Sequence, residues 1–192
     1  MEREVRAIEV LPDVRYHQIG IRSFGKGTFH KPPVTGADLG KKAIYEIREG
    51  DLMFNMVFAW EGAVAVATER DHGLCASHRF PTYRPAAGIA DADYLRLFFE
   101  TAEGRELLDL HSPGTAGRNR TLNRAELLAE PVRLPALESQ LGTVSVIRQA
   151  DEVVVRAAED LTARRALRRA LMDDLIAGGH PLDAALVEGQ GA

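Results

Sequence analysis

Two groups of side chains in this 192-residue chain have residue types and spacings that could support chemistry. His72, Cys75 and His78 stand three residues apart, a spacing that suggests a metal site or a thiol nucleophile beside a base. A zinc site needs about four ligands, and the sequence has no second Cys/His pair at a usable spacing. A lone cysteine is more often a small buried apolar residue than a nucleophile. The sequence therefore favours a structural Cys75 over a small metal-dependent hydrolase.

The second group, Arg118-Asn119-Arg120, combines two side-chain types that read DNA bases. Arg bridges the two acceptors of guanine, and Asn bridges the acceptor and donor of adenine. The surrounding segment, 112–123, is rich in Gly, Ser, Arg and Asn, which indicates a loop, and a short helix is expected at 124–129. Because Asn119 and Asn123 are also good helix caps, the sequence leaves base readout and capping both open.

Charge is unevenly placed along a chain whose formal net charge is −4. The window 15–42 carries six Lys or Arg residues against Asp38 alone, and His17 and His30 lie in the same window. Local patches of Lys and Arg decide phosphate affinity more than the global sum does. A solvated loop with scattered charge is the alternative for this window taken alone.

Composition is that of a globular protein, with 45% hydrophobic and 27% charged residues. No apolar run is long enough to cross a bilayer, and the mixed-charge N-terminus lacks the apolar core of a signal peptide. A single cysteine excludes an internal disulfide and fits a reducing compartment. We therefore expect a cytoplasmic protein with no membrane partner.

The elements that would position these side chains are short strands followed by helices. Strands are expected at 5–10, 16–21, 45–47, 52–60, 63–67 and 74–82, with a hairpin turn at Glu61-Gly62 and a loop at 22–33. Helical patterns cover 91–110 and 124–129, and a proline-bracketed strand is expected at 131–135. The expected fold class is α+β, with a small β-rich domain over 1–135, a long helix over 136–177 and a tail over 178–192.

The segment 136–177 contains no proline and places apolar residues mostly at three- and four-residue steps. A helix of this length extends roughly 60 Å, too far for a domain of this size to cover its apolar stripe. We therefore expect a partner helix. Asp151, Arg165 and Arg168 interrupt the stripe, while an acidic run precedes a basic run. This charge order favours antiparallel pairing of two copies.

An ordered set of short motifs resembles one known family. The set comprises Gly50-Asp51, Trp60-Glu61-Gly62-Ala63, Ser77-His78-Arg79-Phe80, 117–122 and 131–140. It is similar to a target-recognition domain and spacer helix in the DNA specificity subunit of type I restriction–modification systems. The resemblance covers most of 16–148.

The resemblance implies a non-catalytic subunit, without a cofactor of its own, that recognises a bipartite site in double-stranded DNA. Its implied partners are an adenine-N6 methyltransferase subunit that binds S-adenosylmethionine and a restriction translocase subunit. The presence of one recognition domain implies a half subunit that homodimerises through the long helix, or a piece of a larger chain.

The residues we expect to contact DNA are basic or polar and lie in the loops described above. They are Arg22, Lys26, His30, Lys31, Ser77, His78, Arg79, Arg118, Asn119 and Arg120. The bases that they read are not predictable, because recognition loops vary on a fixed body. Two other classes stay open: a DNA-free interaction module, such as an inhibitor of a methyltransferase, and the small metal-dependent hydrolase considered above.

Overall fold

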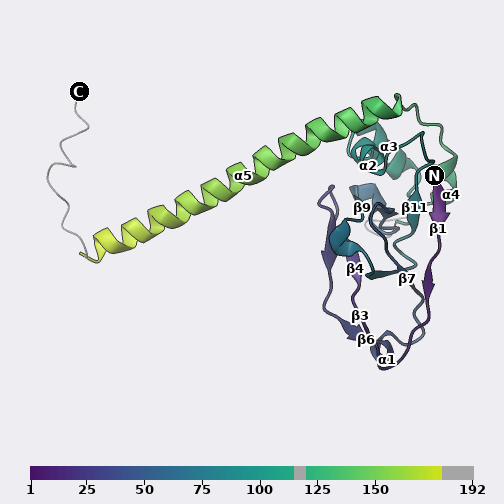
Figure 1. Cartoon of the computed structure of the whole chain (residues 1–192), viewed down its shortest axis with the longest axis horizontal. Helices are drawn as coiled ribbons and strands as arrows, with labels where there is room; N and C mark the ends of the chain where they lie inside the picture. The colour runs from purple at the N-terminus through teal and green to yellow at the C-terminus, as the bar shows by residue number, and fades with distance from the viewer. Residues whose placement is uncertain (115–119, 179–192) are drawn as a thin grey trace. The chain divides into compact units, whose positions relative to one another are not determined.

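The structure, a computed structural model, describes residues 1–114 and 120–178. The chain divides into two compact units, Met1–Val144 and Ser145–Ala192. The first unit holds all the strands of the described residues, and Figure 1 shows the long helix α5 as one uninterrupted rod. The expected α+β class is therefore confirmed, whereas the division into domains at residue 135 stays a prediction.

The β body consists of short antiparallel strands in four small sheets. The largest sheet has the order β1-β11-β8-β9, a second has the order β10-β7-β2, and β3-β6 and β4-β5 form separate pairs. The strands are β1 (Glu2–Glu4), β2 (Ala7–Ile8), β3 (Arg15–Tyr16), β4 (Ile19–Ile21), β5 (Thr28–His30), β6 (Val34–Thr35), β7 (Ile44–Glu46), β8 (Leu52–Phe54), β9 (Val64–Val66), β10 (Cys75–Ser77) and β11 (Thr82–Arg84).

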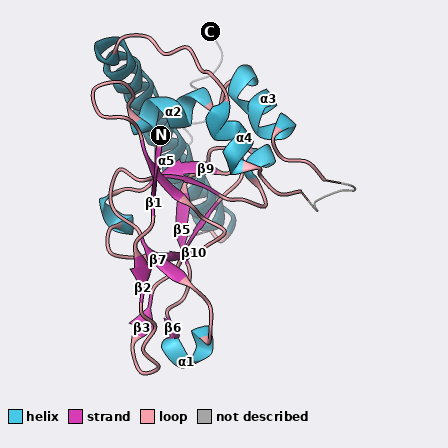
Figure 2. Ribbon diagram, turned by 90° about the vertical axis from the view of Figure 1, so that its right-hand side faces the viewer, coloured by secondary structure: helices cyan, strands magenta, loops and turns pink. Residues whose placement is uncertain are grey.

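Helices lie at both ends of this body. Figure 2 shows α2, α3 and α4 gathered at one end and α1 at the other. The helices are α1 (Gly36–Leu39), the 3-10 helices η1 (Ala59–Glu61) and η2 (Glu69–Asp71), α2 (Ala92–Phe98), α3 (Ala102–Leu110), α4 (Arg124–Ala129) and α5 (Leu137–Ile176).

The main hydrophobic core joins the four-stranded sheet to α2, α3 and α4. Phe54 lies at its centre, with its ring edge-on to Tyr83 at 5.7 Å and to Phe99 at 5.3 Å between centroids. A second core, which includes Ile19 and Ile21, fixes β4 against the body. Each fully buried large apolar side chain contributes about 1.5–3 kcal/mol, so these two cores fix the elements that carry the loops.

The Gly50-Asp51 motif is a structural turn. The Asp51 carboxylate is fully buried and accepts hydrogen bonds from Arg6 at 2.7 and 3.2 Å and from Arg84 Nε at 2.8 Å. It also accepts from the Arg48 backbone N–H at 2.9 Å. Asp51 therefore ties the N-terminal segment and β11 to the start of β8.

The hairpin predicted around Glu61-Gly62 is present as β8 and β9, but its first strand is shorter than expected. β8 ends at Phe54 because the Asn55 side chain accepts a hydrogen bond from the Val57 backbone N–H at 3.2 Å and turns the chain. η1 follows, and Gly62 closes it at φ 72°. The strand expected at 52–60 is thus wrong beyond Phe54.

Other predicted strands are also shorter or divided. The strand expected at 5–10 is confined to β2, and that at 16–21 is divided between β3 and β4. The strand expected at 74–82 is divided between β10 and β11. The prediction of 22–33 as loop alone is wrong, because β5 lies within it and pairs with β4. The Phe29 ring covers Gly20 so closely that an added Cβ would lie 2.5 Å from it.

Two further segments differ from expectation. No strand forms at 131–135, because prolines at both ends remove N–H donors and no other strand pairs with the segment; Leu134 packs against the main core instead. The helix expected at 91–110 is divided into α2 and α3. Thr101 caps α3, and the close approach of Gly104 to the Phe98 carbonyl leaves no room for a Cβ. The predicted Asn123 cap of α4 is confirmed.

The long C-terminal helix expected at 136–177 is confirmed as α5, whose 40 residues extend roughly 60 Å. Its first turns belong to the first unit, where the buried Gln140 amide donates to the Ile89 and Pro135 carbonyls, each at 2.8 Å. The same amide accepts from the Asp91 backbone N–H at 3.0 Å. No helix in the described ranges is long and apolar enough to pass through a bilayer. Apart from Gly178, the predicted tail lies outside the described residues.

Candidate nucleic-acid interface

The turn at residues 55–58 is the meeting point of loops that are distant in sequence. The Met56 backbone N–H donates to the Arg79 carbonyl at 2.9 Å, and the Met56 carbonyl accepts from the Leu122 N–H at 2.8 Å. The loop after β10 and the segment leading into α4 are therefore held on either side of this turn. Because these are backbone hydrogen bonds, the placement does not depend on which side chains the loops carry.

Residues of this turn line three adjoining hollows. The central hollow, about 770 Å³, shares Lys31, Asn55, Phe58 and Phe80 with a hollow of about 580 Å³ beside the β4–β5 hairpin. It shares Val57, His78 and Arg79 with a third hollow of about 500 Å³. We call the continuous surface that lines the three hollows the basic groove.

Charge in the basic groove is strongly one-sided. Among the described residues that line it, Glu61 is the one acidic side chain, and its carboxylate accepts a hydrogen bond from Ser23 Oγ at 2.6 Å. Eight lining residues are basic: Arg3, Arg22, Lys26, Lys31, Lys41, Lys42, Arg79 and Arg124. A hollow lined by one sign of charge focuses the electric field and attracts opposite charges, here anions such as phosphates. The chain achieves this locally despite its net charge of −4.

The β4–β5 hairpin supports its cations on aromatic rings. Lys31 Nζ lies 5.6 Å from the centroid of the Phe80 ring, and Arg22 Cζ lies 5.0 Å from that of Phe29. Arg22 also donates a hydrogen bond to the Thr28 carbonyl across the hairpin. A cation over an aromatic face is stabilised there while the rest of it stays open to solvent. These contacts orient the positive groups without neutralising them.

The structure brings most of the predicted DNA contacts together. Arg22, Lys26, Lys31, Ser77, His78 and Arg79 all line the basic groove. Four further basic residues belong to it that the prediction omitted: Arg3, Lys41, Lys42 and Arg124. The sequence already indicated Lys41 and Lys42 as part of a positive surface, since they lie in the basic window 15–42. The sequence did not indicate Arg3, because Arg3 reaches the groove only through the pairing of β1 with β11.

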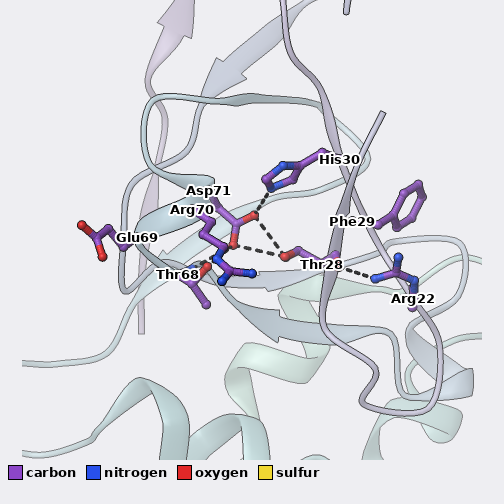
Figure 3. A pocket seen from close by; sticks show the side chains of 8 residues that line it. All are labelled: Arg22, Thr28, Phe29, His30, Thr68, Glu69, Arg70 and Asp71. Atoms are coloured by element: carbon purple, nitrogen blue, oxygen red, sulfur yellow. Dashed lines mark hydrogen bonds and ion pairs between the residues drawn. The ribbon is translucent and has the colours of Figure 1, made fainter. Parts of the chain in front are cut away.

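His30 does not line the basic groove as defined above. It lines an adjoining hollow of about 680 Å³ (Figure 3), which shares Arg22 and Phe29 with the groove, and its Nε2 lies 2.9 Å from Asp71 Oδ1. Thr28 Oγ1 donates to the same carboxylate at 3.0 and 3.1 Å. Burial disfavours the charged form of Asp71, but hydrogen bonds from Thr68, His30 and Thr28 outweigh burial and hold its pKa below the usual range. This cluster anchors β5 to η2.

Arg118 and Asn119 lie outside the described residues, and Arg120 has internal partners. Arg120 Nε and Nη2 donate to the Ser112 and Asp109 carbonyls, each at 2.7 Å, and Nη1 pairs with the Asp109 carboxylate at 2.7 Å. Its guanidinium also lies 5.0 Å from the centroid of the Trp60 ring. Arg120 thus holds the end of the loop. Trp60 is half-buried beneath Arg120.

The His72–Cys75–His78 group does not form a reactive cluster. Cys75 is buried and its thiol donates to the His17 carbonyl at 3.3 Å, and burial raises the pKa of the thiol. His72 Nδ1 lies 3.4 Å from the Glu49 backbone N–H, and His78 faces the basic groove. A raised pKa keeps the sulfur protonated and weakly nucleophilic. Within 1–114 and 120–178, no three His, Cys, Asp or Glu residues are placed to hold a metal ion.

The fold is similar to that of two solved structures. The first is the crystal structure of the HsdS subunit from Thermoanaerobacter tengcongensis, with a TM-score of 0.61 and 16% sequence identity. The second is a chain from a study of complex assembly and conformational transition in the type I R-M system, with a TM-score of 0.59 and 18% identity. These comparisons confirm the expected fold, which is that of a type I restriction–modification specificity subunit.

Both comparisons cover 90% of this chain but only 45% of the other chain. This chain thus spans about half the length of the proteins that it resembles. No protein-family model and no curated protein sequence matches it.

Proposed function

We propose that this chain supplies DNA sequence specificity to a type I restriction–modification system, acts in the cytoplasm and has no catalytic activity of its own. The observation that carries the proposal is the basic groove, a continuous surface with eight Lys or Arg residues on a body whose fold is similar to HsdS. Lys and Arg neutralise phosphates, while His78 and Ser77 offer hydrogen bonds to base edges.

The partners follow from the same resemblance. An adenine-N6 methyltransferase subunit binds S-adenosylmethionine and performs the methyl transfer, and a restriction translocase subunit joins the assembly. This chain directs both to the DNA site and needs no cofactor for recognition. Arg120 acts as a support for the recognition loop, because its guanidinium already has partners in Ser112 and Asp109. Arg118 and Asn119 remain the proposed base-reading residues of that loop.

A second copy of the chain is the proposed partner of α5. Apolar side chains along the helix are exposed in the single chain, among them Val146, Val153, Val154, Leu161, Leu167 and Leu171. Exposed apolar stripes of this length mark interaction surfaces. Antiparallel pairing would bring the acidic residues 151–160 of one copy near the basic residues 164–169 of the other. A two-fold dimer would read a bipartite, palindromic site, since protein symmetry is mirrored in the DNA.

A DNA-free interaction module, such as a methyltransferase inhibitor, is the competing proposal. The basic groove favours DNA binding, because a chain of net charge −4 has no general reason to concentrate eight cations on one surface. A metal-dependent hydrolase is disfavoured by the burial and raised thiol pKa of Cys75.

The first experiment measures binding of the full chain to a 30-base-pair duplex of random sequence between 50 and 200 mM salt, by fluorescence anisotropy. We expect the logarithm of affinity to fall linearly with that of the salt concentration, by roughly 0.9 for each phosphate neutralised. The Lys31→Ala/Arg79→Ala chain should bind more weakly with a shallower slope. Arg133→Ala removes an exposed cation outside the groove and is the matched control. Equal slopes for all three proteins would contradict the proposal.

The second experiment is methylome sequencing of cells that express this chain together with an adenine-N6 methyltransferase subunit of a type I system. We expect methylated adenines in one bipartite motif that disappears when this chain is omitted. Methylation that is unchanged without the chain would contradict a specificity role. A loss of existing methylation on adding the chain, with no DNA affinity, would identify the inhibitor instead.

A further inference from the structure

The turn of the β4–β5 hairpin presents an aromatic side chain that the fold itself does not use. Phe24 is 64% exposed, and no hydrophobic core cluster includes it. Its φ of 64° is left-handed, and within the described residues it is the one non-glycine position with a positive φ. A bulky residue is strained in this conformation, which glycine adopts without cost. Phe24 therefore adds backbone strain to the fold, and its ring contributes little buried apolar surface.

Neighbouring elements hold the backbone of the turn at Phe24. Its backbone N–H donates to the Glu61 carbonyl at 2.8 Å, and the Gly25 N–H donates to the Gly62 carbonyl at 3.1 Å. On the other side, an added Cβ at Gly25 would lie 2.7 Å from the Glu100 carboxylate, so the turn abuts the end of α2. Two backbone hydrogen bonds and this close approach fix the backbone that carries the ring before any partner binds. Strain that is maintained by the surrounding structure is a recurring feature of binding sites.

The surroundings of Phe24 point to a nucleic-acid partner. Lys26 Nζ lies 5.9 Å from the centroid of the Phe24 ring, and Arg22 and Lys31 line the same hollow. The rings of Phe29, Phe58 and Phe80 also line it, so this end of the basic groove combines cations with aromatic faces. Cations beside exposed aromatic rings suit DNA, where phosphates flank flat bases. Apolar side chains of this kind enter between base pairs and unstack them.

We propose that Phe24 is a wedge that stacks on an unstacked base step of the bound duplex, while Lys26 and Lys31 hold the flanking phosphates. The inference rests on the proposed function, since it requires DNA in the basic groove. It adds a recognition mechanism that depends on how easily a step deforms. Pyrimidine–purine steps such as TA and CA unstack most readily, so the recognised sequence should contain one of them opposite Phe24.

The test compares the full-length chain with its Phe24→Gly variant on duplexes that the wild-type chain selects from a random pool. 2-Aminopurine replaces adenine at each TA or CA step in turn and reports unstacking through increased fluorescence. Phe24→Gly removes the ring and also relieves the left-handed strain, so its Tm should equal or exceed that of the wild type. Its affinity should nevertheless fall about 5- to 100-fold, with loss of the fluorescence increase.

Two controls separate the ring from general effects. Phe24→Trp keeps a stacking face and should retain the fluorescence increase at the same step. Ile89→Ala removes a side chain of similar exposure, 62%, at a residue that does not line the basic groove, and should bind as the wild type does. A wild-type affinity and fluorescence increase in Phe24→Gly would overturn the wedge while leaving DNA recognition intact. A wild-type chain that selects no duplex would overturn both the wedge and the proposed function.

Discussion

Two sets of basic side chains in the same body differ in what surrounds them. Arg6 and Arg84 point at the fully buried Asp51 carboxylate, and Arg120 is held by Asp109 and Ser112. By contrast, Lys41, Lys42 and Arg79 line a hollow that has no acidic residue among its described lining. Arginine occurs in both sets, so residue type alone does not separate a structural cation from one that is available to a ligand.

The difference lies in the number of internal acceptors. A buried carboxylate is stable only when cations and N–H groups satisfy it, so Arg6 and Arg84 are committed to the fold. The groove cations remain solvated and repel one another, which costs stability but leaves a positive surface. Substitutions in the first set should therefore affect folding, whereas substitutions in the second should affect DNA binding. The four predictions below test this separation.

The largest effect is expected for Asp51→Ala. Removing the carboxylate leaves Arg6 and Arg84 without their shared partner, and breaking a buried ion pair in this way costs about 3–5 kcal/mol of unfolding free energy. Urea denaturation would measure the loss. Glu46→Ala breaks the exposed Arg48–Glu46 pair, 3.1 Å long, and should cost less than about 1 kcal/mol. Comparable losses for the two variants would contradict the structural role of Asp51.

The second effect concerns Arg120→Ala, which removes three contacts to Asp109 and Ser112. Hydrogen bonds that involve a charged group are worth about 1.5–3 kcal/mol, so we expect a loss of roughly 2 kcal/mol because the contacts are partly exposed. Trp60 is the sole tryptophan, and its fluorescence emission should change because the guanidinium over its ring is lost. An unchanged emission spectrum would show that the two side chains do not meet in solution.

The third effect concerns the groove. Lys41→Ala/Lys42→Ala should lower duplex affinity by about tenfold at 100 mM salt and reduce the salt slope by roughly 1.8, or 0.9 for each lost phosphate contact. The unfolding free energy should change little, because neither lysine packs in a core. Anisotropy titrations and thermal melts measure the two quantities. Arg105→Ala, an exposed cation on α3 outside the groove, should leave both unchanged; an equal loss of affinity there would mean that only total charge matters.

The smallest effect is a pH dependence at Asp71. Its pKa lies below the usual range in the folded chain, so Asp71 binds protons more readily when unfolded. The stabilisation that it provides is therefore fully present above the unfolded pKa of about 3.9 and is lost as pH falls through the lower folded value. Asp71→Asn should flatten this part of the stability profile, as measured by urea denaturation from pH 7 to pH 3. If the unfolding free energy of the variant falls at low pH as it does in the wild type, Asp71 is not the cause of that fall.

Local features were predictable from the sequence, and features that depend on distant partners were not. The Asn123 cap of α4 was predictable because a capping hydrogen bond spans only three residues. The strand expected at 131–135 was wrong because strand formation needs a pairing partner that the local sequence does not specify. Arg3 and Arg79 meet in one hollow through strand pairing, and no local pattern indicates that.

The candidate site shows the same limit. Lys26, Lys31 and Arg79 were identified because basic side chains on loops are visible in a sequence. The acceptors that engage Arg120 and the carboxylate beside His30 were not visible, since they come from other parts of the chain. Counting cations thus located the surface, but only the structure separated the cations that are paired with carboxylates of the body from those that line the basic groove.

The Gln140 amide has a consequence for how the molecule responds to its surroundings. It fastens the first turns of α5 through three hydrogen bonds to the Ile89 and Pro135 carbonyls and the Asp91 N–H, and none of these groups ionises at its bonding atom. A rise in ionic strength weakens the attraction between lysines and phosphates, but it has little effect on these hydrogen bonds between uncharged groups. In the proposed complex, release from DNA and detachment of the first turns of α5 would therefore depend on separate variables, and a salt wash would free the protein with these turns still in place.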